Sequence, residues 1–189
     1  LVDPRPLVEN LAVVQEGATE TLHYEEGHTA TVAVLREETE TGSFKNLQLY
    51  INLLGASVTD WRYHHQQYYT MLAILPTALH PDPRHVFVAG LASGVTTGAA
   101  ALDERTEKVT CVEISPEVIR AAPFFDEFNF SVCENPRVRI LADDARAYLA
   151  TTQESYDLLI SDCFLSAVTG TAALYSKEYF KLCRSRLAP

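Results

Sequence analysis

The chain has 189 residues, with 15 Lys and Arg against 25 Asp and Glu, and a formal net charge of −10 at pH 7. A hydrophobic fraction of 47% with 21% charged residues is ordinary for a globular protein and excludes a wholly disordered chain. The acidic balance argues against nucleic acid as a partner, because affinity for phosphate groups comes from Lys and Arg. The length predicts one domain, with at most a small appendage.

The sequence carries no targeting signal that we recognise. No stretch approaches the roughly 18 uninterrupted apolar residues of a membrane span, and the start lacks the basic region of a signal peptide. The only methionine is Met71, so we expect an excerpt from a longer protein. The four cysteines are scattered and form no Cys-x-x-Cys pair: Cys111, Cys133, Cys163 and Cys183. This pattern favours free thiols over a disulfide or zinc framework, and we therefore expect a cytoplasmic location.

Residues 1–60 show an alternation of apolar and polar side chains. The alternating runs occupy residues 22–27, 29–37 and 47–53. Period-two alternation with β-branched and aromatic residues is typical of antiparallel strands. We therefore predict a small N-terminal β-domain over residues 1–60, with three or four strands and an exposed acidic turn at 36–43.

From residue 61 onward the pattern changes to helices that alternate with short apolar strands. Strand-like runs occupy residues 85–90, 109–114, 137–144 and 156–162, and helical patterns occupy 63–79, 94–104, 115–125, 144–153 and 173–187. Ser115 and Pro116 are a typical N-cap and first position of a helix. The alternation predicts an α/β domain with a Rossmann-like parallel sheet over residues 61–189.

Each predicted parallel strand ends abruptly in a glycine or an acid. Gly90 follows the first strand and Glu113 the second, Asp143 and Asp144 follow the third, and Asp162 follows the fourth. An acid at this place can equally cap the next helix. Acids after three successive strands nevertheless favour a ligand site, because parallel sheets bind ligands at the carboxyl ends of their strands.

The first of these turns is rich in small residues and reads Gly90-Leu91-Ala92-Ser93-Gly94. Glycines permit a tight turn and a close approach of the backbone to a ligand at a helix N-terminus. Glu113 lies 23 residues after Gly90, close to the spacing of roughly 20 expected for an acid that binds ribose hydroxyls. The pair favours a nucleoside-bearing cofactor over a purely structural turn. The loop lacks the Gly-Lys-Ser/Thr ending of a P-loop.

The predicted helix over residues 63–79 holds weaker candidates. His64 and His65 could bind a metal, but adjacent residues do not share a helix face, so we expect no metal. The tyrosines of this helix could line a pocket or simply pack: Tyr63, Tyr68 and Tyr69.

Several segments together resemble the polyamine aminopropyltransferases, or spermidine synthases, and especially the bacterial spermidine-synthase-like domains. The segments that carry the resemblance are residues 24–34, 47–57, 72–100, 109–119, 135–149, 156–162 and 173–189. The resemblance implies a class I methyltransferase-like sheet preceded by the small β-domain, with the C-terminal strands of the family missing from this excerpt.

The resemblance also implies a nucleoside co-substrate, decarboxylated S-adenosylmethionine or S-adenosylmethionine, with no permanently bound cofactor. Glu113 would bind the ribose hydroxyls, Ile114 would pack on the adenine and Asp143 would accept from its amino group. Gly90 and Gly94 would lie beside the thioether. The full set of residues expected to bind the co-substrate is Gly90, Ser93, Gly94, Glu113, Ile114, Asp143 and Asp144.

For catalysis, the resemblance implies that Asp162 takes a proton from the attacking amine and that Tyr68 orients this amine. Three positions depart from the family pattern. Ser93 stands where an acid grips the donor's ammonium group, Leu165 replaces the second acid after the fourth strand, and Tyr69 replaces a Gln or His. An unpaired ammonium in an apolar pocket is costly, so we expect altered amine binding.

The sequence therefore predicts a transferase that moves an aminopropyl group from decarboxylated S-adenosylmethionine to an amine. One alternative is an S-adenosylmethionine-dependent methyltransferase with the same loop, and another is a catalytically silent nucleoside-binding domain. As partners we expect a small-molecule amine acceptor and a second copy of the chain in a homodimer.

Overall fold

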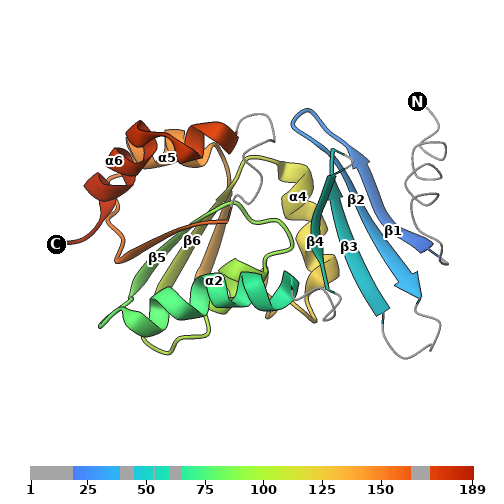
Figure 1. Cartoon of the computed structure of the whole chain (residues 1–189), viewed down its shortest axis with the longest axis horizontal. Coiled ribbons are helices and arrows are strands. Elements are labelled where there is room, and N and C mark those ends of the chain that lie inside the picture. The colour runs from blue at the N-terminus through green and yellow to red at the C-terminus, as the bar shows by residue number, and fades with distance from the viewer. Residues whose placement is uncertain (1–18, 39–44, 53, 60–64, 163–170) are drawn as a thin grey trace.

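The computed structural model describes residues 19–38, 45–52, 54–59, 65–162 and 171–189, which form two sheets with helices packed against them (Figure 1). None of the described helices is long and apolar enough to cross a membrane. The boundary that we predict between residues 60 and 61 lies outside the described residues, as do Tyr63, His64 and Leu165.

The N-terminal sheet contains four antiparallel strands in the order β1-β2-β3-β4. Their bounds are Thr19–Glu26 for β1, Thr31–Glu38 for β2, Lys45–Ile51 for β3 and Leu54–Val58 for β4. Val32 and Val34 of β2 lie on one face because side chains alternate along a strand, and both are fully buried. This face packs against Val118 and Phe125, which follow the second parallel strand. The predicted antiparallel domain is confirmed in its strand pattern.

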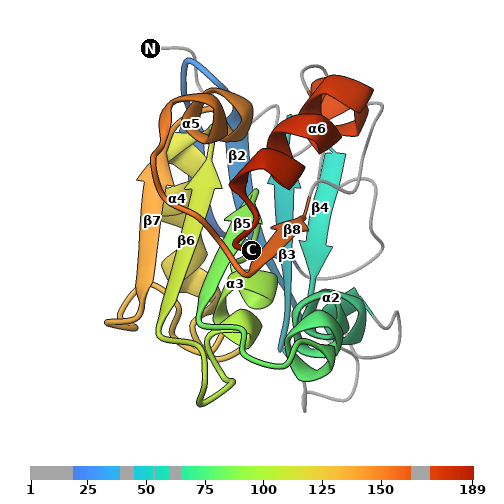
Figure 2. The ribbon, with the colours of Figure 1, turned by 90° about the vertical axis from the view of Figure 1, so that its left-hand side faces the viewer.

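The parallel sheet has the strand order β7-β6-β5-β8, which can be followed from left to right in Figure 2. Its strands are β5 (His85–Ala89), β6 (Lys108–Glu113), β7 (Val138–Ala142) and β8 (Leu158–Ser161). The central strand β5 pairs with β6 on one side and β8 on the other. The order thus reverses at β5, and a reversal of this kind is where open α/β sheets bind ligands. The Rossmann-like prediction is confirmed.

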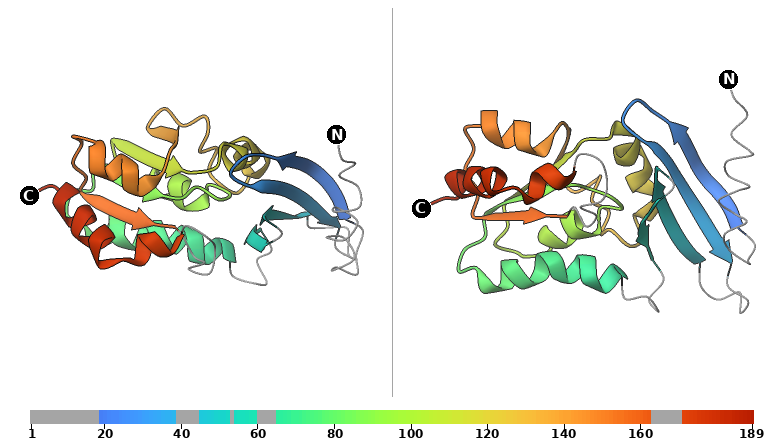
Figure 3. Two further views of the ribbon diagram at one scale, coloured as in Figure 1. Left: turned by 90° about the horizontal axis from the view of Figure 1, so that it is seen from above. Right: turned by 45° about the horizontal axis from the view of Figure 1, so that its top comes forward.

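Helices cover both faces of the parallel sheet. The helices α2 (His65–Leu79) and α3 (Val95–Ala100) share one apolar cluster with β5, whereas α5 (Ala145–Thr151) and α6 (Lys177–Arg186) share the cluster on the other face. Figure 3 shows the remaining helix α4 (Pro116–Ala121) between the two sheets. A 3-10 turn, η2 (Ala122–Phe125), continues α4.

The helix after β5 and the last helix are both shorter than the sequence predicts. The helix predicted over residues 94–104 ends as α3 at Ala100, and the Arg137 guanidinium donates to the carbonyls of Ala101 and Asp103 beyond its end. The last helix begins only at Lys177, after the 3-10 turn η3 (Thr171–Tyr175). Ser176 separates the two because its hydroxyl caps the helix by accepting from the Tyr179 N–H at 3.2 Å.

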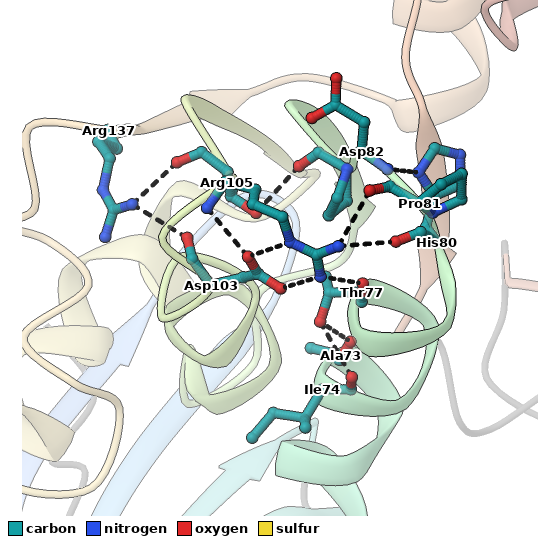
Figure 4. A network of polar contacts seen from close by, with 11 residues as sticks. Ala73, Ile74, Thr77, His80, Pro81, Asp82, Asp103, Arg105 and Arg137 are labelled. Carbon is teal, nitrogen blue, oxygen red and sulfur yellow. Dashed lines mark hydrogen bonds and ion pairs between the residues drawn. The ribbon is translucent and has the colours of Figure 1, made fainter.

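The amino edge of the parallel sheet is joined to α2 by Arg105, shown in Figure 4. The Arg105 guanidinium donates to the carbonyls of Thr77, His80 and Pro81 at 2.9 to 3.1 Å and to the Asp103 carboxylate at 2.6 Å. The last carbonyls of a helix have no partner within the helix, so Arg105 supplies donors at the end of α2.

Candidate functional site

The residues that follow the parallel strands meet at one edge of the sheet. Backbone hydrogen bonds fix their register: the Gly90 N–H donates to Val112 O at 2.9 Å, and the Asp162 N–H donates to Ala89 O at 2.8 Å. The Asp143 N–H donates to the carbonyl of Glu113 at 3.0 Å. The structure thus brings the strand-end candidates of the sequence together at this carboxyl edge.

The Gly-rich loop between β5 and α3 needs glycine at both of its ends. Gly90 and Gly94 have φ of 90° and 87°, in the left-handed region that other residues rarely adopt. A Cβ atom on Gly94 would also lie 2.8 Å from the Val132 side chain. These glycines let the backbone approach the end of β6, where Glu113 lies.

Glu113 is buried at the end of β6, with 8% of its surface exposed. Its Oε2 accepts from the Leu91 N–H at 2.8 Å and its Oε1 accepts from the Ser115 N–H at 3.0 Å. Burial raises the pKa of Glu113, and these N–H donors oppose that rise. The carboxylate therefore joins the Gly-rich loop to the start of α4. The N–H groups of Ala92 and Ile114 also face this carboxylate.

Asp162 is partly buried directly after β8. Burial raises its pKa to about 6, the negative charge of Glu113 adds to the rise, and a hydrogen bond from Thr96 opposes it. The Thr96 hydroxyl also lies 3.1 Å from the Tyr69 carbonyl, so its single proton serves one acceptor at a time. A carboxylate with this pKa is ionised at neutral pH and can still take up a proton readily.

Tyr68 and Tyr69 of α2 have different environments. The Tyr69 side chain is buried and its hydroxyl donates to the Ala56 carbonyl of β4 at 2.9 Å. Burial raises the pKa of Tyr69 to about 12, and the charge of Asp162 contributes. Tyr68 is 48% exposed. Tyr69 thus packs α2 against the N-terminal sheet, whereas the Tyr68 ring, 5.3 Å from that of Tyr69, remains accessible.

Ser93 of the Gly-rich loop is paired with a residue that the sequence analysis did not identify. Its hydroxyl lies 2.8 Å from the hydroxyl of Ser57 on β4, and both side chains are buried. The Asn129 side chain donates to the Ser93 carbonyl at 2.9 Å and to the Ala122 carbonyl at 2.9 Å. No local pattern marks Ser57 or Asn129, because each lies 36 residues from Ser93.

The remaining candidates lie beside Glu113 and after β7. Ile114 is 57% exposed, so its apolar side chain can contact a ligand. Asp143 and Asp144 are also exposed. The Asp144 carboxylate accepts from the Ala147 N–H at 2.8 Å and caps α5, and Asp143 accepts from the Asp144 N–H at 2.8 Å. The capping interpretation therefore applies to Asp144, whereas Asp143 lies next to the carboxyl edge.

Similarity to solved structures extends over most of the chain. The structure of spermidine synthase from Thermotoga maritima aligns with a TM-score of 0.73 at 20% identity, covering 88% of this chain and 53% of that one. A spermidine synthase in complex with the transition-state analogue AdoDATO aligns with a TM-score of 0.72 at 19% identity, covering 88% and 52%. At these identities the comparison shows the fold.

Sequence comparisons give the family. The polyamine aminopropyltransferase of Methanocaldococcus jannaschii is 30% identical over 114 residues, which are 60% of this chain and 39% of the relative. That of Desulforudis audaxviator is 28% identical over 162 residues, or 86% and 56%. The chain thus spans about half the length of these relatives, or less. Residues 65–189 match the spermine/spermidine synthase domain. With two thirds of its length matched in this way, the chain belongs to the spermine/spermidine synthase domain family.

Proposed function

We propose that this chain binds an adenosylsulfonium donor at its carboxyl edge and transfers the donor's aminopropyl group to an amine. The observation that carries the proposal is the meeting of the Gly-rich loop, Glu113 and Asp162 at the point where the strand order reverses. The donor would be decarboxylated S-adenosylmethionine, bound as a co-substrate.

The nucleoside half of the donor would lie over β6. Glu113 would accept from the ribose hydroxyls, and the N–H groups of Leu91 and Ser115 fix the orientation of its carboxylate. Ile114 would pack on the adenine and Asp143 would accept from the adenine amino group, since both are exposed beside Glu113. Gly90 and Gly94 would leave room for the sulfonium portion.

The reacting half would lie near Asp162. A protonated amine has no free lone pair, so the Asp162 carboxylate first takes its proton. The amine nitrogen then attacks the carbon next to the sulfonium, a C–N bond forms, and the C–S bond breaks. The electron pair of that bond stays on sulfur, which leaves as the neutral thioether of methylthioadenosine. Tyr68 would orient the amine, and the charges of Asp162 and Glu113 would attract both cationic substrates.

One observation favours a second candidate function, methyl transfer from intact S-adenosylmethionine. At the place where the resemblance implies an acid for the donor's ammonium group, this chain has the neutral pair of Ser57 and Ser93. An ammonium there would lack a charged partner, and unpaired polar groups can reduce specificity by orders of magnitude. We therefore expect weak turnover with putrescine as the amine.

The partner and location remain predictions. We propose a homodimer, which sedimentation or size-exclusion measurements on the purified chain would test. We also propose a reducing compartment, the cytoplasm. The described cysteines are free thiols, with Cys111 buried and Cys133 exposed, and a reducing compartment maintains thiols in this state.

The proposed function is tested by product analysis. The purified chain would be incubated with decarboxylated S-adenosylmethionine and a panel of diamines, and in parallel with intact S-adenosylmethionine. Release of methylthioadenosine that depends on the diamine supports aminopropyl transfer, and its loss in Asp162→Asn assigns it to this site. Release of S-adenosylhomocysteine would favour the methyltransferase. Binding of methylthioadenosine without turnover of either donor would identify a silent nucleoside-binding domain.

A further inference from the structure

We infer that Glu117 is a positioning residue for the nucleoside site, and that it links the turn between β1 and β2 to the Glu113 carboxylate. The inference rests on the proposed role of Glu113 in binding the nucleoside. The N-terminal sheet contains neither the Gly-rich loop nor the ends of the parallel strands. On this inference it nevertheless helps to set the geometry of the site.

The link consists of hydrogen bonds that share atoms. The Thr29 hydroxyl donates to Glu117 Oε2 at 2.6 Å, and the Ser115 hydroxyl donates to the same oxygen at 2.7 Å. The Ser115 N–H donates to Glu113 Oε1 at 3.0 Å. Glu113 in turn accepts from the Leu91 N–H of the Gly-rich loop. The turn of the N-terminal sheet is thus joined to the Gly-rich loop through two carboxylates and one serine.

The turn approaches Glu117 closely because residue 27 is glycine. A Cβ atom on Gly27 would lie 1.9 Å from Glu117 Oε1, inside contact distance. The turn is closed by the Gly27 N–H, which donates to the Ala30 carbonyl at 2.9 Å. This geometry places the Thr29 hydroxyl against Glu117, and a larger residue at position 27 would displace one of them.

Glu117 remains charged although only 5% of its surface is exposed. The hydroxyl donors Thr29 and Ser115 lower the pKa of Glu117 to about 2. An ionised carboxylate only accepts hydrogen bonds, so it determines the direction of the Ser115 hydroxyl proton. The lone pairs of that hydroxyl then face the Val118 N–H, which donates to it at 3.4 Å as the cap of α4. The orientation of Ser115, and with it the N–H that Glu113 accepts, depends on Glu117.

The same junction offers a matched control. Glu25 of β1 accepts from the Arg120 guanidinium of α4 at 2.6 to 3.1 Å, so this ion pair also joins the N-terminal sheet to α4. Glu25 is not among the hydrogen-bond partners of Ser115 or Glu113. Arg120 also lies 3.6 Å from Glu117 Oε1, so both substitutions alter the charges around Arg120. Glu25→Gln leaves the hydrogen bonds of Thr29 and Ser115 to Glu117 in place, whereas Glu117→Gln keeps the size of the side chain and changes those hydrogen bonds.

The test is calorimetric titration of methylthioadenosine into the unsubstituted chain, Glu117→Gln, Thr29→Val and Glu25→Gln. We expect Glu117→Gln to weaken binding about 5-fold to 10-fold and Thr29→Val about 3-fold, with Glu25→Gln within about 2-fold of the unsubstituted chain. In turnover, Glu117→Gln should raise KM for the donor and leave kcat unchanged. Equal losses in Glu117→Gln and Glu25→Gln, or unchanged binding in Glu117→Gln, would overturn the inference.

Amide hydrogen exchange without ligand separates this inference from the proposed function. Glu117→Gln should increase exchange at the Ser115 amide about 10-fold, and Glu25→Gln should leave it unchanged. If the unsubstituted chain binds no methylthioadenosine while this exchange pattern is observed, the proposed function fails and the positioning of Glu113 by Glu117 stands. Unchanged Ser115 exchange in Glu117→Gln would refute the positioning itself.

Discussion

The two ends of the parallel strands differ in the partners of their acidic side chains. At the amino edge, where the strands begin, acids form ion pairs with basic side chains. At the carboxyl edge, where the strands end, the described acids accept hydrogen bonds from backbone N–H groups and a hydroxyl. At the amino edge, Arg105 pairs with Asp103 at 2.6 Å and Lys108 pairs with Glu154 at 2.9 Å. At the carboxyl edge, Glu113 accepts from the N–H groups of Leu91 and Ser115. The same sheet therefore places its acids in two electrostatic environments.

Two aspartates show what this difference means. Hydrogen bonds from Arg105 lower the pKa of Asp103 to about 2, so its ionised form stabilises the fold. Burial raises the pKa of Asp162 to about 6, so its ionised form destabilises the fold. Charge held at a cost to stability is typical of functional sites. We therefore propose that the paired charges of the amino edge stabilise the fold and that the acids of the carboxyl edge serve the chemistry.

The largest effect is expected for Asp162→Asn, which keeps the shape of the side chain and removes the proton acceptor. Turnover should fall by about 10²-fold to 10⁴-fold while methylthioadenosine affinity changes little. In the unsubstituted chain, kcat/KM should decrease below about pH 6 as Asp162 becomes protonated, and this limb should vanish in the variant. Steady-state kinetics measured as a function of pH checks both the loss of turnover and the loss of the pH dependence. Full turnover in Asp162→Asn would show that the aspartate is structural.

A second effect is expected at the Gly-rich loop. Ser93→Asp places a carboxylate beside the Ser57 hydroxyl and supplies a charged partner for an ammonium. The substitution should raise the affinity for decarboxylated S-adenosylmethionine, relative to that for intact S-adenosylmethionine, by about 10-fold. Ser57→Ala, which removes the hydroxyl pair without adding charge, is the control and should leave this ratio nearly unchanged. An unaltered ratio in Ser93→Asp would mean that the donor's ammonium binds elsewhere.

At the amino edge, Arg105→Ala should lower Tm and leave methylthioadenosine affinity unchanged. The variant removes the donors to the carbonyls of Thr77, His80 and Pro81 and leaves the end of α2 without them. Arg84→Ala is the matched control, because Arg84 forms exposed ion pairs and should affect Tm little. Thermal unfolding followed by circular dichroism measures both. Lost nucleoside affinity in Arg105→Ala would contradict the division between the two edges.

The smallest effect sharpens the contrast between the two aspartates. The pKa of Asp162 is higher in the folded chain than its ordinary value, so folding favours the protonated carboxyl group. The stability that this preference contributes at low pH is lost as the pH rises through about 6. Asp162→Asn should therefore be more stable than the unsubstituted chain by on the order of 1 kcal/mol at neutral pH, and equally stable near pH 4.

Asp103→Asn should show the opposite sign. Because the pKa of Asp103 is lowered, its ionised carboxylate contributes stability at pH values above the ordinary pKa of an aspartate. This contribution is lost as the pH falls towards about 2, so the substitution should destabilise the chain at neutral pH. Urea unfolding at the two pH values gives the comparison. Equal effects of both substitutions at both pH values would refute the electrostatic difference.

The sequence predicts the features of this molecule that depend on local patterns. Alternating strands and helices predict the parallel sheet, and the spacing from Gly90 to Glu113 predicts that they lie together. The cap of α4 at Ser115 is also local, because it needs only the residues that follow it. These features are readable because the periodicity of a helix or strand is determined by its own residues.

Contacts between distant segments leave no such pattern. Thr29 and Glu117 are 88 residues apart, and a glutamate in the first turn of a helix is ordinary at any surface. Ser57 and Ser93 are likewise 36 residues apart. The site therefore divides into a backbone frame that the sequence predicts and side-chain partners that tertiary packing determines.

The most direct test of the nucleoside site is calorimetric titration of methylthioadenosine into the unsubstituted chain and into Glu113→Ala. A hydrogen bond to a charged group contributes about 1.5–3 kcal/mol, so we predict that the unsubstituted chain binds and that Glu113→Ala binds roughly 10-fold more weakly or worse. The folded state of the variant is checked by circular dichroism. A folded Glu113→Ala with unchanged affinity, or an unsubstituted chain that releases no heat of binding, would contradict the assignment of the carboxyl edge to a nucleoside.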